Sequence, residues 1–407
     1  MTVAVSPVAA SSAVPASTDA VMRAIVSELS DRFYERGEVV RAVVVAVLAR
    51  QHSFLLGPPG TGKSELCRAL TQRITGARQW EMLLSKFTSP SKMFGPIDVG
   101  ALAQGQYRQI LDDHAATAHI AFVDEIFKCG VGALNETLSW LNERRYSPES
   151  GGAPIECPLI SAVTASNELP DGEETAAIWD RLSVRIQVDY LQTESTFIDL
   201  LKAEQSGSGP VTTVDLDALL HAVRIEVPAV AVPDAIFETV ARLRATLRED
   251  GIVVSDRRWK QSVGLLRASA WLAGRDRVED TDLIILTHVL WSTLTERQTV
   301  AERVLEAVNP DEREALTAEE AITELGREFD QKHADLSPDD LCVWVIKEAN
   351  SKLNSLKTTL ADLHTRASSA ARSTGTIDRV ESIRADLHAR MMSQLLNAPT
   401  QANGTQP

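Results

Sequence analysis

Cysteine is rare and scattered in this sequence of 407 residues. The four cysteines form no C-x-x-C pair and no cluster with histidine; they are Cys67, Cys129, Cys157 and Cys342. The sequence therefore predicts neither a disulfide framework nor a structural zinc site, and reduced thiols in the cytoplasm are the expected state.

Long apolar runs, an excess of basic charge and fixed-period repeats are absent as well. The longest apolar run, Val39–Leu48, is interrupted by Arg41 and falls short of the roughly 18 residues of a membrane span. With 41 Lys and Arg against 56 Asp and Glu, the net charge of −15 disfavours nonspecific binding to nucleic acids or anionic membranes, although a local basic face stays open. Residues 1–17 lack the basic segment of a signal peptide, so we expect a disordered tail there.

The sequence does contain a glycine-rich phosphate-binding loop. A short apolar run, Ser53–Leu56, leads into the pattern G-x-x-x-x-G-K-[ST], and a helix-forming segment, Glu65–Arg73, follows. The loop consists of Gly57, Pro58, Pro59, Gly60, Thr61, Gly62, Lys63 and Ser64. The glycines let backbone N–H groups turn toward phosphates, Lys63 would reach the β- and γ-phosphates, and the Ser64 hydroxyl would bind Mg²⁺. The loop predicts binding of a nucleoside triphosphate.

Two acidic residues follow a second apolar run. Ile120–Val123 followed by Asp124 and Glu125 is typical of a buried parallel strand with carboxylates at its C-terminal end, where open α/β sheets bind ligands. We expect Asp124 to hold Mg²⁺ through its water shell and Glu125 to orient and partly deprotonate the attacking water. A further predicted strand, Leu159–Ala165, ends close to Asn167, which by itself could be an ordinary turn residue.

Strands and helices alternate until about residue 190. We predict helices at 18–36, 39–50 and 132–144, a further strand at 186–189, and a hairpin insertion at Arg145–Pro158. Residues 190–300 are predicted to be mostly helical, with a flexible break at Gln205–Pro210 and helices at Ser255–Gly274 and Asp280–Leu294.

Beyond about residue 310 glycine nearly disappears and charges become frequent. Ser337 begins a helix with a capping side chain, a proline in the first turn and two acids. Apolar residues then recur at spacings of three and four in two stripes, Ile346, Ala349, Leu353, Leu356, Leu360, Leu363 and Ala367, and after a polar break Ile377, Val380, Ile383, Leu387 and Met391. The pattern predicts an antiparallel helical hairpin, which either packs on its own chain or forms an arm that binds a partner.

Taken together, these motifs resemble the AAA+ ATPases of the MoxR family, and within it the RavA-like subgroup. The resemblance covers about residues 18–300. It rests on the phosphate loop and on the runs Val123–Lys128, Leu141–Arg144, Ala165–Pro170 and Ser255–Lys260, of which the last two indicate the subgroup. It implies a P-loop NTPase fold in which a parallel sheet with helices on both faces is followed by an all-α lid. We therefore divide the chain into a core at 18–192, a lid at 193–308, the hairpin at 309–398 and a tail at 399–407.

The family implies that the chain assembles as a ring, usually a hexamer, with ATP and Mg²⁺ between neighbouring subunits. Asn167 matches the sensor of the γ-phosphate. Arg181 matches the arginine finger that reaches the neighbour's γ-phosphate, although Leu182 stands where the family usually has Phe, and Arg185 is the alternative.

The resemblance extends to a second sensor and to two loops. Arg257 matches the second sensor of the lid, with Arg258 as the alternative; read alone, any of these arginines could form a surface salt bridge. Residues 86–110 and the predicted hairpin at 145–158 resemble loops that face the pore in related rings. The small β-rich domain of the RavA pattern has no counterpart, because residues 310–407 show no strand-like alternation.

The resemblance implies a chaperone-like remodeller of proteins that works with a partner carrying a von Willebrand factor A domain. Two alternatives are a motor acting on nucleic acids and a nucleotide-gated scaffold without turnover. The acidic charge argues against the first. The second is disfavoured by the complete set of Lys63, Asp124, Glu125, Asn167 and Arg181.

Overall fold

The computed structural model describes residues 17–148, 153–170, 172–203, 211–369 and 374–396. The chain divides into two compact units, of which the first ends at Ala301 and the second begins at Glu302. The predicted tails and the predicted break at Gln205–Pro210 lie outside the described residues, except for Ser17, which is the N-cap of the first helix. None of the helices in the described ranges is long and apolar enough to cross a membrane.

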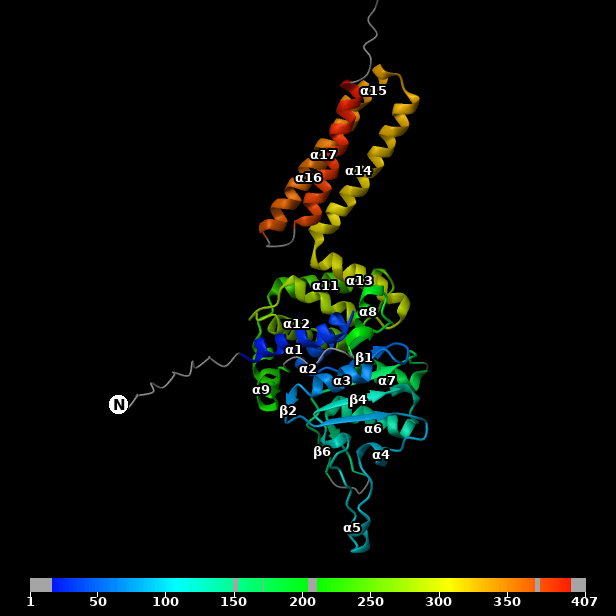
Figure 1. Cartoon of the computed structure of the whole chain (residues 1–407), viewed down its shortest axis with the longest axis vertical. Helices are drawn as coiled ribbons and strands as arrows, with labels where there is room; N and C mark the ends of the chain where they lie inside the picture. The colour runs from blue at the N-terminus through cyan, green and yellow to red at the C-terminus, as the bar shows by residue number, and fades with distance from the viewer. Residues whose placement is uncertain (1–16, 149–152, 171, 204–210, 370–373, 397–407) are drawn as a thin grey trace, which may run out of the picture. The chain divides into compact units, whose positions relative to one another are not determined.

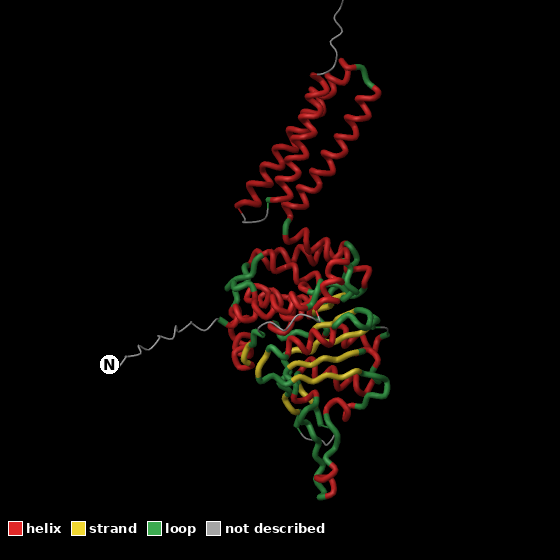
Figure 2. The backbone as a smooth tube through the Cα atoms, viewed as in Figure 1, coloured by secondary structure: helices red, strands yellow, loops and turns green. Residues whose placement is uncertain are grey.

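A five-stranded parallel sheet forms the centre of the first unit (Figures 1 and 2). The strand order is β3 (Gln79–Leu83), β4 (Ile120–Asp124), β7 (Ser161–Ser166), β1 (Ser53–Leu56) and β8 (Val184–Gln187). All residues of β1 and β7 are buried, as expected for the central strands of a parallel sheet. Asp124 pairs with Ala165 and Leu56 pairs with Ser166, so the carboxyl ends of the three central strands meet at one edge. This architecture confirms the predicted fold class.

Helices pack on this sheet and on one another. They include α1 (Thr18–Arg32), α2 (Gly37–Leu48), α3 (Lys63–Thr71), α6 (Val131–Glu143) and α7 (Glu173–Arg181). Because α2 contacts β7 and β8 on one side and α1 and α12 (Asp256–Leu272) on others, its valines are buried around most of the helix. The first helix ends at Arg32 instead of near Arg36, since the chain leaves helical geometry at Phe33 and Glu35 has a φ of 55°.

The remaining part of the first unit is mostly helical, as predicted. It contains α8 (Glu194–Ala203), α9 (Leu216–His221), α10 (Val227–Ala229), α11 (Asp234–Glu249) and α12, and a short parallel pair of β2 (Ile74–Thr75) with β9 (Val214–Asp215). The α-helix that we predicted at Asp280–Leu294 is wrong: the structure has a 3₁₀ helix over Asp280–His288. Leu283, Leu286 and Val289 are buried at intervals of three, the period of a 3₁₀ helix.

Both predicted insertions contain local structure. The first holds α4 (Pro90–Phe94) and α5 (Val99–Ala103), and Figure 1 shows α5 at the tip of a projection of the first unit. In the second, β5 (Arg145–Tyr146) pairs antiparallel with β6 (Ile155–Glu156), which confirms the predicted hairpin. Residues 149–152 of this hairpin lie outside the described part of the chain.

In the second unit, α14 (Pro310–Asp335), α16 (Asn350–Ser369) and α17 (Gly375–Leu396) pack together in a bundle. The predicted hairpin corresponds to α16 and α17, which pack on α14 of their own chain. Ile346 is an exception to the predicted stripe. A π-helical turn at Val345–Ala349, placed between α15 (Pro338–Trp344) and α16, changes the helical phase, so Val345 is buried and Ile346 is 58% exposed.

Candidate active site

The phosphate loop connects β1 to α3 and depends on three glycines. Gly60 and Gly62 both have a φ of 80°, a conformation that glycine adopts without strain, and Gly62 is the N-cap of α3 without a side-chain capping bond. A Cβ atom on Gly57 would collide with the carbonyl oxygen of Val188, the residue that follows β8. The first turn of α3 is therefore presented to the loop with its backbone N–H groups and the positive end of its dipole, an arrangement suited to anions.

Lys63 lies at the start of α3 and reaches back along the loop. Its Nζ atom donates hydrogen bonds of 2.8 Å to the carbonyl oxygens of Gly57 and Pro58. Burial lowers the pKa of Lys63, whereas the charges of Asp124 and Glu125 raise it. The loop ammonium and the two acids at the end of β4 therefore belong to one electrostatic cluster.

The two acids differ in backbone geometry. Asp124 is the last residue of β4, and its Oδ1 atom accepts a 3.0 Å hydrogen bond from the backbone N–H of Glu125. Glu125 has a φ of 53°, which costs a residue with a Cβ about 1–3 kcal/mol and is characteristic of functional positions. Its Oε1 atom lies 3.2 Å from Nζ of Lys128.

Ser166 is a residue of this site that the sequence reasoning missed. It is the buried last residue of β7, and its hydroxyl donates a 3.1 Å hydrogen bond to Oε2 of Glu125. Its carbonyl oxygen accepts the N–H of Gly57, so Ser166 joins the loop to the acids. Asn167 is the exposed residue that follows it. The sequence feature that could have indicated Ser166 is its position at the end of a buried strand. Side chains at the carboxyl ends of parallel strands face the ligand site at that edge of the sheet.

These residues fit a magnesium-bound triphosphate. The open first turn of α3, the Lys63 ammonium and the glycine backbone supply donors for phosphate oxygens. The Ser64 hydroxyl, in the first turn of α3, and the Asp124 carboxylate supply the oxygen ligands that Mg²⁺ prefers.

A cavity of about 590 Å³ lies beside the phosphate loop. It is lined by Arg32, Phe33, Tyr34, Arg36, Gly60, Thr61, Gly62, Glu65, Tyr190, Leu191, Phe197 and Leu200. Apolar and aromatic side chains thus form much of a wall that continues directly from the glycines of the loop. Such a cavity suits a flat, largely apolar ring attached to phosphates.

Glu35 fixes one wall of this cavity. Its carboxylate accepts hydrogen bonds from the backbone N–H groups of Gln192 (2.8 Å) and Thr193 (2.9 Å) and from the Thr196 hydroxyl (2.6 Å). These bonds, that of Thr196 first, lower the pKa of Glu35 to about 2. The turn between α1 and α2 is thereby tied to the beginning of α8, which carries Phe197.

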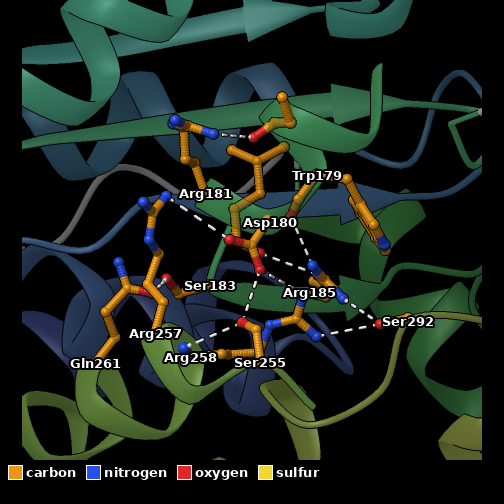
Figure 3. A network of polar contacts seen from close by, with 12 residues as sticks. Trp179, Asp180, Arg181, Ser183, Arg185, Ser255, Arg257, Arg258, Gln261 and Ser292 are labelled. Carbon is orange, nitrogen blue, oxygen red and sulfur yellow. Dashed lines mark hydrogen bonds and ion pairs between the residues drawn. The ribbon is translucent and has the colours of Figure 1, made fainter. Parts of the chain in front are cut away.

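The four candidate arginines fall into two groups (Figure 3). Arg185 is fully buried, and its guanidinium donates to the carbonyl oxygens of Leu182 (3.0 Å), Trp179 (2.5 Å) and Trp291 (2.5 Å). Arg258 is 3% exposed. Burial lowers the pKa of both arginines.

Arg181 and Arg257 are more accessible. Arg181, the last residue of α7, is half-buried and donates a 2.6 Å hydrogen bond to the carbonyl oxygen of Ala177. The side chain of Arg257 is 45% exposed and lies 3.7 Å from Asp180. Among the described residues, neither arginine forms a hydrogen bond or an ion pair with loop residues 57–64.

Comparisons with known proteins identify the family of this chain. Residues 20–214 match a family described as the MoxR domain in the MoxR-vWA-beta-propeller ternary systems, and residues 235–304 match the AAA lid domain. The uncharacterized protein MJ0812 of Methanocaldococcus jannaschii is 30% identical over 353 residues, which cover 85% of this chain and 92% of that protein. A second protein of that organism, MJ0079, is 32% identical over 311 residues, or 76% of this chain and 80% of its own length.

A solved structure supports the fold. The crystal structure of a protein from Cytophaga hutchinsonii, described as a candidate ATPase, superposes with a TM-score of 0.58 at 16% identity. The match covers 72% of this chain and 95% of the other chain.

Proposed function

Because this chain belongs to the MoxR family of AAA+ ATPases, we propose that it hydrolyses ATP to ADP and phosphate in a Mg²⁺-dependent reaction. The observation that carries the proposal is the placement of Glu125, whose carboxylate is oriented by Ser166 and Lys128 next to Asp124 and the phosphate loop. A carboxylate held in this way is suited to accept a proton from an attacking water.

The residues of the site divide between phosphate binding, metal binding and activation of water. The glycine loop, Lys63 and the first turn of α3 bind the phosphates, and Ser64 and Asp124 hold the metal. Bound Mg²⁺ would neutralise negative charge on the β- and γ-phosphates. Asn167 lies at the carboxyl edge of the sheet, where its amide can hydrogen bond to the γ-phosphate or to the water.

The cavity beside the loop is the proposed site of the nucleoside. Its apolar and aromatic wall would contact the base, and its connection to Gly60–Gly62 would orient the phosphates toward Lys63. The bonds that Glu35 accepts from the segment just before α8 and from Thr196 in α8 keep this wall in position without depending on the nucleotide.

In this proposal a neighbouring subunit completes the site. Arg181 is half-buried at the end of α7, and among the described residues it makes no bond to the phosphate loop of its own chain. We propose that Arg181, together with Arg257, acts on phosphates bound by the next subunit of a ring, most simply a hexamer. An arginine supplied in this way offsets the negative charge of the transition state. The engagement of Arg185 with three carbonyl oxygens supports Arg181 over Arg185 in this role.

The biological role that we propose is chaperone-like remodelling of a protein client, as in the RavA-like subgroup. The projecting segment around α5 and the hairpin of β5 and β6 would contact the client. The family description supports a partner with a von Willebrand factor A domain. We keep the division into a core at 18–192, a lid at 193–308 and a helical hairpin at 309–398 as part of this proposal.

Phosphate release by purified protein tests the proposed reaction. The wild type should hydrolyse Mg-ATP with a rate per subunit that rises with protein concentration, because assembly completes the site. Lys63→Ala should abolish nucleotide binding and turnover, whereas Glu125→Gln should retain binding and lower kcat by about 10²-fold or more. Turnover that survives both substitutions would contradict the assignment of the site.

A further inference from the structure

The carboxylate of Asp180 connects the end of α7 to the beginning of α12 (Figure 3). Its Oδ1 atom accepts a 2.8 Å hydrogen bond from the Ser255 hydroxyl, and its Oδ2 atom lies 3.7 Å from Nη1 of Arg257. Ser255 is the N-cap of α12, and its oxygen also accepts the backbone N–H of Arg258. One acidic side chain therefore holds the first turn of α12 against the helix that ends with Arg181.

The arginines around Asp180 are of two kinds. Arg185 and Arg258 are buried and both donate to the Ser292 hydroxyl, at 3.3 Å and 3.2 Å. Nη2 of Arg258 also lies 3.6 Å from Oδ1 of Asp180, so Asp180 is a counter-ion of this buried arginine as well as of Arg257. The two buried arginines join α7, β8, α12 and the segment after the 3₁₀ helix and serve the structure of this region. Arg181 is half-buried and the side chain of Arg257 is 45% exposed, so the arginines on these two helix ends are less enclosed than Arg185 and Arg258.

The two accessible arginines lie close enough to influence each other. The pKa of Arg181 is lowered by burial and then by the positive charge of Arg257, while Asp180 and Glu143 raise it. Asp180 pairs with Arg257 and adjoins Arg181 in the chain, so its negative charge reduces the repulsion between the two cations. Glu143, by contrast, belongs to α6 and makes no bond to α12 among the described residues.

From this arrangement we infer that Asp180 is a positioning residue that holds Arg257 of α12 beside Arg181, so that both arginines act as one cationic pair on the neighbouring subunit's nucleotide. The inference rests on the proposed ATP hydrolysis at subunit interfaces. Because Arg257 belongs to α12 and Arg181 to α7, any displacement of α12 relative to α7 would disturb the pair and slow hydrolysis at the neighbouring site.

Asp180→Asn tests this role, since it removes the charge and keeps an oxygen that can accept the Ser255 bond. Asp256→Asn is the matched control: Asp256 is in the same first turn of α12, is 87% exposed and pairs with Arg244 at 2.8 Å. Asp180→Asn should lower kcat by about tenfold while KM and the Kd for a fluorescent ATP analogue change by less than about twofold. Asp256→Asn should leave all three values unchanged. A wild-type kcat in the Asp180→Asn protein would overturn the inference.

Mixed rings and hydrogen exchange provide readouts that separate positioning from simple destabilisation. Asp180→Asn mixed with Lys63→Ala should regain activity, because some interfaces then combine an intact loop with an intact arginine pair; mixed with Arg181→Ala it should not. In the nucleotide-free protein, backbone amides of residues 255–260 should exchange faster in Asp180→Asn than in Asp256→Asn. Unchanged exchange, or equal recovery in both mixtures, would overturn the inference.

A second variant covers the case in which Asp180→Asn does not fold. Ser255→Ala breaks the 2.8 Å bond and leaves the Asp180 charge in place. It should lower kcat with little change in analogue affinity, and a loss of affinity without a loss of kcat would overturn the inference. Absence of nucleotide binding and turnover in the wild type would instead contradict the proposed function.

Discussion

The Ser166 hydroxyl donates a 3.1 Å hydrogen bond to Oε2 of Glu125, and this bond joins the carboxyl ends of β7 and β4. Oε1 of the same carboxylate lies 3.2 Å from Nζ of Lys128. Since Glu125 also has the left-handed backbone conformation, three local features determine the direction of the proposed catalytic base.

Replacement of Ser166 by Ala should therefore reduce catalysis without reducing nucleotide binding. We expect kcat to fall by about tenfold, because the carboxylate keeps its charge but loses one of the groups that orient it. The Kd for an ATP analogue should stay at its wild-type value, since within the described part of the chain the Ser166 side chain makes no bond to the phosphate loop.

Ser161→Ala is the matched control on the same strand. Its hydroxyl donates a 2.6 Å hydrogen bond to the Gln51 carbonyl oxygen at the opposite end of β7. This substitution should lower the free energy of unfolding by about 1 kcal/mol and leave kcat unchanged. Equal kcat values for the Ser166 and Ser161 variants would contradict the orienting role of Ser166.

The anchor formed by Glu35 should depend on pH in a defined direction. Its pKa is lowered from 4.5 to about 2 in the folded protein, so its contribution to stability is present above pH 4.5 and is lost as the pH falls toward 2. We expect Glu35→Gln to be less stable than the wild type at pH 7, with a difference that shrinks between pH 4.5 and the lowest pH at which both fold. Urea unfolding at several pH values measures the difference.

The same variant should weaken nucleotide binding at neutral pH, because the anchored beginning of α8 carries a wall of the cavity. Glu65→Gln is a suitable control, since Glu65 lines the same cavity but forms its ion pair with Arg32, 2.7 Å away. A stability difference that grows as the pH falls would contradict the assigned role of the Glu35 carboxylate.

The sequence predicted the parts of the site that are contiguous in the chain. The loop around Lys63 and the strand ending in Asp124 each carry their own local pattern, and the burial of β1 and β4 follows from their aliphatic residues. Ser166 and Glu35 could not be found in this way, because their partners are 41 and 157 or more residues away. Their roles depend on strand order and on tertiary packing, and neither can be predicted from the local sequence around these two residues.

The distinction between Arg181 and Arg185 required the structure for the same reason. Both lie in one short run of sequence, and only packing against Trp179 and Trp291 makes Arg185 a buried structural residue. The exposed Ile346 illustrates a different limit, since a π-helical turn shifts the phase of an otherwise regular stripe.

Two glycine-to-alanine substitutions should have opposite effects on stability, because a Cβ atom would collide with backbone at Gly57 but would only raise helix propensity at Gly264. Gly57→Ala should lower the free energy of unfolding and abolish nucleotide binding, because the added Cβ would collide with the Val188 carbonyl oxygen. Gly264 lies within α12, and a Cβ there would meet no atom within 4 Å. Gly264→Ala should therefore raise the free energy of unfolding by about 0.5–1 kcal/mol. Thermal and urea unfolding check both, and a neutral Gly57→Ala would contradict the close approach of β8 to the loop.

Arg181 and Arg185 should respond in opposite ways to the same substitution. Arg185→Met leaves buried carbonyl oxygens without donors and should lower the free energy of unfolding by about 3 kcal/mol. Arg181→Met should change it by less than about 1 kcal/mol but lower kcat by about 10³-fold, the effect of losing an arginine finger. Circular dichroism melting and phosphate release measure the two effects.

Mixing experiments then show on which subunit Arg181 acts. Arg181→Met combined with Lys63→Ala should regain part of the wild-type activity, because one subunit supplies an intact loop and its neighbour an intact arginine. Native mass spectrometry establishes that the rings are mixed. No recovery in such rings would place the action of Arg181 within its own subunit, and a stable but inactive Arg185→Met protein beside an active Arg181→Met protein would reverse the assignment of the two arginines.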